Sequence, residues 1–206
     1  TTLCAMIRDL AREEINIVTL EDPVEYHIPG VSQCQINEKT GMTFASGLRA
    51  ILRQDPDIIS VGEIRDGETA SIAMRSAITG HLVLSTLHTN DSVSAVFRLR
   101  DIGVEPWLIA SALRGVVSQR LVRKVCPHCK KPYTPPVEEL AVLGMSPEDH
   151  ATFYKGEGCP ECHHTGYTGR RAVFEIFMIN GRIRQLVSKD APIDDLMAAA
   201  RKEGFV

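Results

Sequence analysis

The chain has 206 residues, of which 44% are hydrophobic and 24% charged, with a formal net charge of −3 at pH 7. This balance is typical of a soluble globular protein, and it excludes a strongly basic protein that binds nucleic acid through its overall charge. No apolar run approaches the roughly 18–20 residues of a membrane-spanning helix, so we expect a soluble chain that meets membranes only through a partner or a surface.

The first part of the chain alternates amphipathic helices with short apolar strands, which is the pattern of a parallel α/β sheet. Helices are predicted over residues 3–10, 44–54, 66–78 and 90–103, and buried strands over 15–20, 58–63 and 81–87. The segment 27–42 interrupts this pattern and is interpreted as a hairpin. A further helix is predicted to begin at Pro106 and to run to about Lys124.

The composition changes at Cys126, because residues 126–170 are rich in Cys, Pro, Gly and His. A short helix is predicted near 137–143, a strand after Arg170, and then two short helices, of which the second begins at Pro192. The chain is therefore predicted to contain a core over 1–124, a cysteine-rich module over 125–170, and a C-terminal strand with short helices over 171–206.

One segment is strongly basic, although the whole chain is not. Residues 114–131 contain no acid and six basic side chains, Arg114, Arg120, Arg123, Lys124, Lys130 and Lys131. Two interpretations are open: a solvated helix face, or a contact with an acidic partner or lipid head groups.

Six cysteines fall into two groups. Cys4 and Cys34 are isolated and are interpreted as buried thiols. The other four have the spacing C-x2-C-x29-C-x2-C and are Cys126, Cys129, Cys159 and Cys162. Paired CxxC motifs of this kind are typical of a structural Zn²⁺ site, since four thiolates fill the tetrahedron and leave no open position. A redox pair and a nucleic-acid-binding ribbon are the alternatives, and His128, His163 or His164 could replace one ligand.

Ionisable side chains end all three predicted strands. Glu21 ends the first, Glu63 ends the second, and His88 follows the third. Ligands of open α/β sheets bind beyond the carboxyl ends of the strands, and a phosphate-bound Mg²⁺ needs carboxylate or water oxygens there. We therefore expect the three side chains to meet in one crevice, although polar residues also commonly cap strands.

Three stretches resemble the sequence motifs of a known superfamily. VTLEDPVEY is similar to the Asp box, LRQDPDIISVGEIRD to the Walker B segment and GHLVLSTLHTND to the His box of the secretion ATPase superfamily. These proteins are the hexameric motors of type II secretion and type IV pilus assembly. The resemblance covers the whole chain. It implies an α/β, RecA-like P-loop NTPase core that lacks its N-terminal strands and phosphate loop, an inserted tetracysteine zinc module and a small helical C-terminal part.

The resemblance places Thr1 in the first helical turn just after the phosphate loop, so that the backbone N–H groups of Thr1 and Thr2 would touch the α-phosphate. It implies that Glu21 orients the attacking water, Glu63 holds Mg²⁺ through a water and His88 contacts the γ-phosphate. Which glutamate is the base stays open. Candidates for neutralising charge, also across a subunit boundary, are Arg49, Arg53 and Arg65. Each arginine could instead form a surface ion pair.

The implied function is that of a cytoplasmic ATPase, peripheral at the inner membrane, that uses ATP, Mg²⁺ and Zn²⁺. Its partners would be identical subunits in a homo-hexamer and inner-membrane platform proteins. The tetracysteine set favours secretion or pilus extension over retraction. Without the phosphate loop, we expect the chain to be inactive alone. An alternative is a non-catalytic, zinc-bearing platform for an inner-membrane partner. A nucleic-acid motor is disfavoured by the negative charge and the aromatic content of 5%.

Overall fold

The computed structural model describes residues 2–149 and 151–205. The chain divides into two compact units, one made of Thr1–Ser118 with Glu175–Val206 and the other of Gln119–Phe174. The predicted C-terminal part, 171–206, therefore does not stand apart, because from Glu175 onward it belongs to the first unit.

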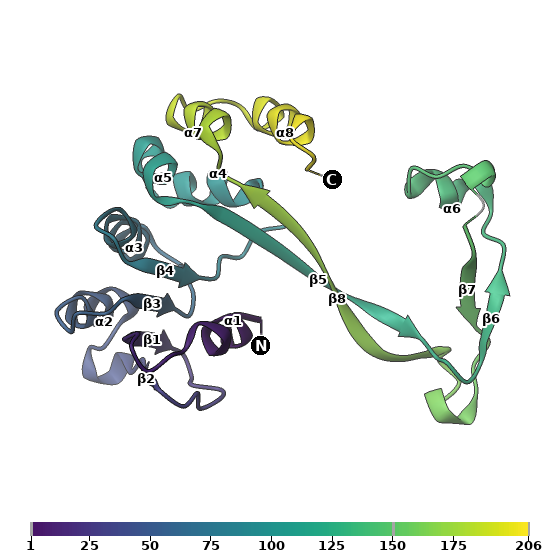
Figure 1. Cartoon of the computed structure of the whole chain (residues 1–206), viewed down its shortest axis with the longest axis horizontal. Coiled ribbons are helices and arrows are strands. Elements are labelled where there is room, and N and C mark those ends of the chain that lie inside the picture. The colour runs from purple at the N-terminus through teal and green to yellow at the C-terminus, as the bar shows by residue number, and fades with distance from the viewer. Residues whose placement is uncertain (1, 150, 206) are drawn as a thin grey trace. The chain divides into compact units, whose positions relative to one another are not determined.

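A four-stranded parallel sheet organises the first unit (Figure 1). Its order is β2-β1-β3-β4, and its strands are β1 (Ile17–Glu21), β2 (Val31–Gln35), β3 (Ile58–Val61) and β4 (Leu82–Ser85). The three predicted strands are confirmed. The predicted hairpin is wrong, because residues 22–30 carry the chain back to the start of β1, so that β2 pairs with β1 in parallel from Ile17↔Val31 onward.

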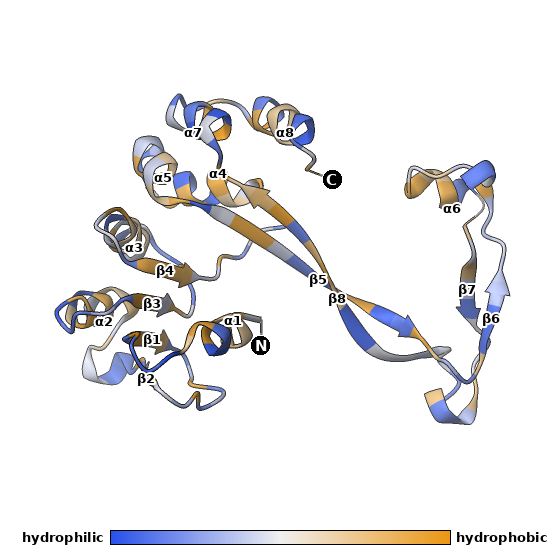
Figure 2. Ribbon diagram, viewed as in Figure 1, coloured by the Kyte–Doolittle hydropathy of each residue, from blue (hydrophilic) through white to orange (hydrophobic). Residues whose placement is uncertain are grey.

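Both faces of the sheet are covered by helices. Leu20, Ile59 and Val61 belong to the main core under α2 (Phe44–Ile51) and α3 (Gly67–Ile78). Ile17 and Ile58 pack with α1 (Thr2–Leu10) on the opposite face. Figure 2 accordingly shows strongly hydrophobic strands at the centre of the sheet. None of the helices in the described part of the chain combines the length and apolarity needed to cross a membrane.

The helix ends follow the sequence signals for the most part. The side chain of Asp66 caps α3 as predicted, accepting a hydrogen bond of 2.8 Å from the backbone N–H of Thr69. The next helix, α4, covers Ser94–Asp101, and Asp91 accepts a hydrogen bond of 2.7 Å from the backbone N–H of Ser94. α5 begins at Pro106 as predicted.

The predicted continuation of α5 to about Lys124 is wrong. The helix spans Pro106–Ala112, and strand β5 (Gly115–Val125) follows it. β5 pairs with β8 (Tyr167–Met178) in a two-stranded ribbon. The sequence VVSQRLVRKV is rich in β-branched valine, and its pairing with β8 satisfies the backbone in an extended conformation. Most of the basic segment therefore lies on a strand and its turn, not on a helix face.

The C-terminal helices complete the main core of the first unit. They are α7 (Gly181–Ser188) and α8 (Ile193–Lys202), which begins after Pro192 as predicted. Phe177, Ile183 and Leu196 are almost fully buried in this core, and an ion pair joins Arg100 of α4 to Asp190 between the two helices.

The second unit is small and contains the cysteine motifs. Its antiparallel pair consists of β6 (Lys130–Tyr133) and β7 (Phe153–Gly156). The short helix α6 (Val137–Val142) confirms the prediction near 137–143, and a single 3₁₀ turn covers Pro160–Cys162. Further 3₁₀ turns lie at Pro147–Asp149 in this unit and at Glu38–Thr40 in the first.

Candidate functional site

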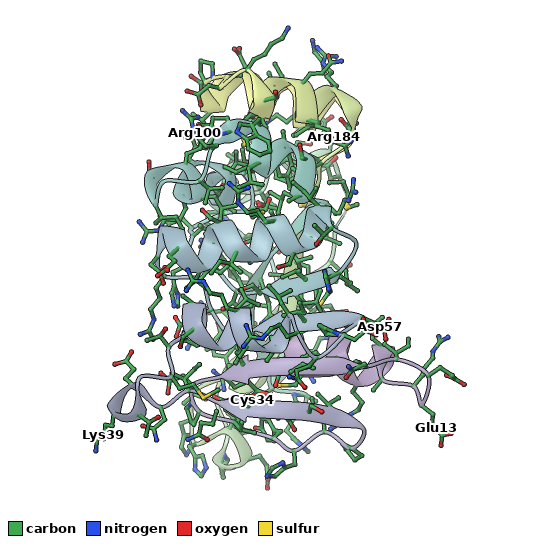
Figure 3. All side chains as sticks on the ribbon, turned by 90° about the vertical axis from the view of Figure 1, so that its left-hand side faces the viewer. Glu13, Cys34, Lys39, Asp57, Arg100 and Arg184 are labelled. Carbon is green, nitrogen blue, oxygen red and sulfur yellow. The ribbon has the colours of Figure 1, made fainter. Side chains whose placement is uncertain are left out.

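The parallel sheet brings the ends of β1, β3 and β4 to one edge. In Figure 3, Glu13 and Asp57, which precede β1 and β3, lie at one end of the strands, and Lys39, which follows β2, projects from the other. Glu21 is the last residue of β1, and Glu63 comes two residues after β3. Both glutamates therefore lie at the carboxyl edge of neighbouring strands, where an α/β sheet binds ligands.

Glu63 forms a compact cluster with two cationic or potentially cationic groups. Its Oε1 accepts a hydrogen bond of 2.5 Å from Arg65, and its Oε2 lies 3.4 Å from Nε2 of His88. The Arg65 hydrogen bond lowers the pKa of Glu63, burial opposes that shift, and Coulombic attraction to Arg65 and the His88 contact add to it. Reciprocally, the hydrogen bond to Glu63 raises the pKa of Arg65. Glu63 is thus kept ionised beside the imidazole of His88.

Hydrogen bonds from two hydroxyl groups join the segment after β3, which carries Glu63, to the segment after β4, which carries His88. The hydroxyl of Thr86 donates to the carbonyl oxygen of Gly62 at 2.7 Å, and that of Ser85 donates to the carbonyl oxygen of Val61 at 2.7 Å. The backbone N–H of Ile64 donates to Thr86 in return, at 3.0 Å. The segment beyond Thr86 forms an open hollow lined by Leu87, His88, Thr89 and Asn90. The side chain of His88 is 88% exposed there, so it is free to meet a ligand.

Glu21 has its own set of hydrogen-bond partners. Its Oε1 accepts hydrogen bonds from the hydroxyl of Thr19 at 2.6 Å and from the amide of Gln33 at 2.8 Å. The backbone of β1 and the end of β3 are close, since a Cβ built on Gly62 would lie 3.5 Å from the Cα of Glu21. Sequence reasoning missed Thr19 and Gln33. The alternation of side chains along a strand, which puts Thr19 on the same face as Glu21, is the signal that could have found the first.

The remaining predicted residues lie elsewhere or outside the described range. Arg49 forms an ion pair of 2.5 Å with Glu68, and both side chains are more than half exposed. Arg53 donates to the backbone carbonyl of Arg49 at 3.2 Å. Of the three arginines, the structure therefore brings only Arg65 to Glu63, and roles for Arg49 and Arg53 stay predictions. Thr2 begins α1, and Thr1 lies outside the described residues.

The second unit gathers its four cysteines in one place. The sulfurs of Cys126, Cys129, Cys159 and Cys162 all lie within 4.8 Å of one another. Three of the pairs are separated by 3.7–3.9 Å. Four thiolates at about 2.3 Å from a tetrahedral Zn²⁺ would be about 3.8 Å apart, so the spacing fits that ion. Among the described residues no histidine joins the group, and the interpretation with a replaced ligand is therefore not needed.

Backbone N–H groups point at the sulfurs of this cluster. Cys162 Sγ accepts from the backbone N–H of Cys159 at 3.2 Å and of Gly166 at 3.3 Å, and Cys129 Sγ accepts from Gly158 at 3.3 Å. Burial acts to raise the pKa of the Cys162 thiol, but the backbone bonds from Cys159 and Gly166, together with contacts to the Cys159 and Cys129 side chains, lower it to about 6. Burial raises the pKa of Cys159 to about 11. The backbone donors to Cys162 stabilise its thiolate, which is the form that binds metal.

Comparison with known proteins shows the family to which the chain is similar. Residues 1–206 match the family described as Type II/IV secretion system protein. The chain is 49% identical over 204 residues to the Type II secretion system protein E of Pseudomonas aeruginosa, covering 99% of this chain and 41% of that protein. It is 50% identical over 206 residues to the Type IV pilus assembly ATPase PilB of Thermus thermophilus, covering 99% of this chain and 23% of that protein.

Solved structures agree with these sequence relatives. The pilus retraction motor PilT with bound ADP superposes with a TM-score of 0.66 at 28% identity, covering all of this chain and 54% of that one. The ATPase DotB of Yersinia pseudotuberculosis has a TM-score of 0.67 at 22% identity over all of this chain and 47% of that one, which supports the fold. The chain spans 41% and 23% of the lengths of the two sequence relatives named above. Since the family match covers every residue, the chain belongs to the Type II/IV secretion system protein family.

Proposed function

We propose that this chain is the catalytic and metal-binding part of an ATPase that drives type II protein secretion or type IV pilus assembly. The observation that carries the proposal is the cluster of Glu63, Arg65 and His88 at the carboxyl edge of the sheet, with Glu21 on the neighbouring strand. Phosphoryl transfer needs little more from a protein than positioned charge, and this edge supplies acids, a guanidinium and an imidazole.

Each side chain has a role that its surroundings suit. Glu63, held ionised, would hold Mg²⁺ through a water, and the ion would neutralise charge on the phosphates. Glu21 would orient the attacking water. His88, exposed beside Glu63, would contact the γ-phosphate, and Arg65 would neutralise charge once a ligand draws it from Glu63. The sequence contains no Gly-x-x-x-x-Gly-Lys-Ser/Thr phosphate loop.

The cysteine cluster would hold one structural Zn²⁺. Four sulfurs at tetrahedral spacing fill the coordination sphere, so the ion would shape the second unit and leave no position for water. About one zinc per chain should survive dialysis at neutral pH, and Cys126 and Cys159 should resist alkylation until a chelator removes it. Elemental analysis that finds no zinc, together with free alkylation, would remove this site.

Assembly and location follow from the same proposal. The protein would work in the cytoplasm as a homo-hexamer, at the inner membrane, through the platform proteins of the secretion or pilus machinery. The similarity to a secretion protein E and to a pilus assembly ATPase supports both pathways about equally, with identities of 49% and 50%.

Phosphate release in a full-length protein that carries this chain tests the catalytic proposal. We expect Mg²⁺-dependent ATP hydrolysis, and no turnover above background from residues 1–206 alone. Glu63→Gln should keep ATP binding but reduce turnover about 100-fold or more, because the variant would no longer hold the Mg²⁺ that stabilises charge in the transition state.

Glu13→Gln is the matched control. Glu13 is exposed at the opposite end of the sheet (Figure 3), so this variant should hydrolyse ATP at the wild-type rate. Near-normal turnover by Glu63→Gln would move the metal role elsewhere. A full-length protein that binds zinc and a partner but no nucleotide would favour the alternative of a non-catalytic platform.

A further inference from the structure

Two side chains that carry no charge converge on one oxygen of Glu21. Thr19 lies opposite Gln33 in the parallel pairing of β1 and β2, and both residues face the same side of the sheet as Glu21. The hydroxyl of Thr19 and the amide N–H of Gln33 donate to Glu21 Oε1 at 2.6 and 2.8 Å. Two donors on a single oxygen fix the rotation of the carboxylate plane, and so set the direction in which Oε2 points.

Neither donor can swing away easily. Thr19 is fully buried within β1, where its hydroxyl has few other directions to point. The amide of Gln33 is anchored at both ends, because its oxygen accepts from the backbone N–H of Ile28 at 2.8 Å and its nitrogen also donates to the carbonyl oxygen of Tyr26 at 3.0 Å. The contacts to Ile28 and Tyr26 fasten the loop 22–30 to β2 and hold the Gln33 N–H toward Glu21.

We propose that Thr19 and Gln33 are positioning residues for Glu21, which aim its carboxylate at the water that attacks the γ-phosphate. This inference rests on the proposed ATPase function and names the residues that set up its water-orienting group. Neither side chain touches the nucleotide in this scheme. Their effect is on the geometry of the reacting water, since a misplacement of about 1 Å in such a group can cost about 100-fold in rate.

The test uses steady-state ATP hydrolysis by a full-length protein that carries this chain. Gln33→Met keeps the length of the side chain and removes its hydrogen bonds, and Thr19→Val keeps the branched shape and removes the hydroxyl. Each variant should lower kcat about 10- to 100-fold and change KM for ATP less than about threefold, because positioning acts on the chemical step and not on ground-state binding.

Gln35→Met separates aiming of the carboxylate from fastening of the loop. Gln35 lies two residues along the same strand and accepts a hydrogen bond from the backbone N–H of Val24 at 3.3 Å, so it holds the same loop. Its variant should keep kcat within about twofold of wild type. Gln33→Glu serves as a second variant, since it keeps an acceptor for Ile28 but replaces the donor with a like charge, and it should lose kcat at least as strongly as Gln33→Met.

A double variant distinguishes the failure of this inference from the failure of the proposed function. In a Glu21→Gln background, Gln33→Met should have almost no further effect on kcat, since the group it aims is already gone. The positioning role is refuted, while the ATPase function stands, by either of two results. In the first, Glu21→Gln is inactive but Gln33→Met and Thr19→Val keep the wild-type kcat. In the second, Gln35→Met lowers kcat as much as Gln33→Met does. If Glu21→Gln has normal turnover, both the proposed role of Glu21 and the positioning role of Thr19 and Gln33 are refuted.

Discussion

The cysteine cluster depends on a glycine that no cysteine motif contains. Gly156 ends β7, and a Cβ built on it would lie 2.0 Å from the carbonyl oxygen of Gly166 and 2.7 Å from its carbonyl carbon and its Cα. The backbone of Gly166 contacts two of the cysteines. Its N–H donates to Cys162 Sγ at 3.3 Å, and its carbonyl oxygen accepts from the backbone N–H of Cys126 at 2.9 Å.

Gly156→Ala should therefore disturb the metal site from a distance. A Cβ in a real protein does not approach another heavy atom closer than 3.0 Å, so the backbones at 156 and 166 must separate by about 1 Å. Metal–ligand distances tolerate only about 0.2 Å, and loss of groups that orient ligands typically costs about 10- to 100-fold in metal affinity. We expect a loss of at least this size, equivalent to about 1.4–2.8 kcal/mol.

Competition with a chromophoric chelator measures this affinity directly. Gly181→Ala is the control, because a Cβ there meets no atom within 4 Å, and it should bind zinc as the wild type does. If Gly156→Ala binds zinc with wild-type affinity, the reasoning that couples Gly166 to the sulfurs is refuted. Loss of zinc without loss of the secondary structure of the first unit would show that the effect is confined to the second.

Three further predictions concern the stability of the first unit. Phe177→Ala should lower the free energy of unfolding by about 3–5 kcal/mol, since Phe177 is 1% exposed and packs edge-to-face on Phe205 at 5.7 Å; denaturant titration measures this. Because the pKa of Glu63 is lowered in the folded protein, its contact with Arg65 stabilises the fold fully at pH values above the ordinary pKa of 4.5. This stabilisation is lost as the pH falls through the lowered pKa. Glu63→Gln should therefore make the midpoint of thermal unfolding depend less on pH in acid. Asp66→Ala should cost about 1 kcal/mol by removing the cap of α3, measured by thermal unfolding against wild type.

The sequence predicted the central strands β1 and β3 well because they are buried on both faces. Residues such as Ile17, Leu20 and Ile59 form short continuous apolar runs, and these runs have few alternatives in an α/β chain. β2 was missed because it lies at the edge of the sheet and is only partly buried, so polar Ser32, Gln33 and Gln35 hide its pattern. Its parallel pairing depends on the path of the loop, which no local signal encodes.

The ribbon and the details of the site were beyond local reasoning for a related reason. β5 was predicted as a helix because Pro106 opens one, and the partner that makes it a strand, β8, lies about 50 residues further along the chain. For the site, strand-end positions brought Glu21, Glu63 and His88 to one edge, and the adjacent Arg65 was found with them. The placement of Arg49 beside Glu68 depends on side-chain contacts between two helices, and motif spacing does not describe these.

The way in which the polypeptide leaves and rejoins its first unit has a practical consequence. The chain departs after Ser118 and returns at Glu175 along two hydrogen-bonded strands, and the described members of the main core all come from before or after that stretch. Residues 119–174 are thus joined to the first unit through strands β5 and β8. Replacing these residues with a tight turn would leave the packing of the first unit intact. The same position between β5 and β8 would accept the insertion of a foreign domain.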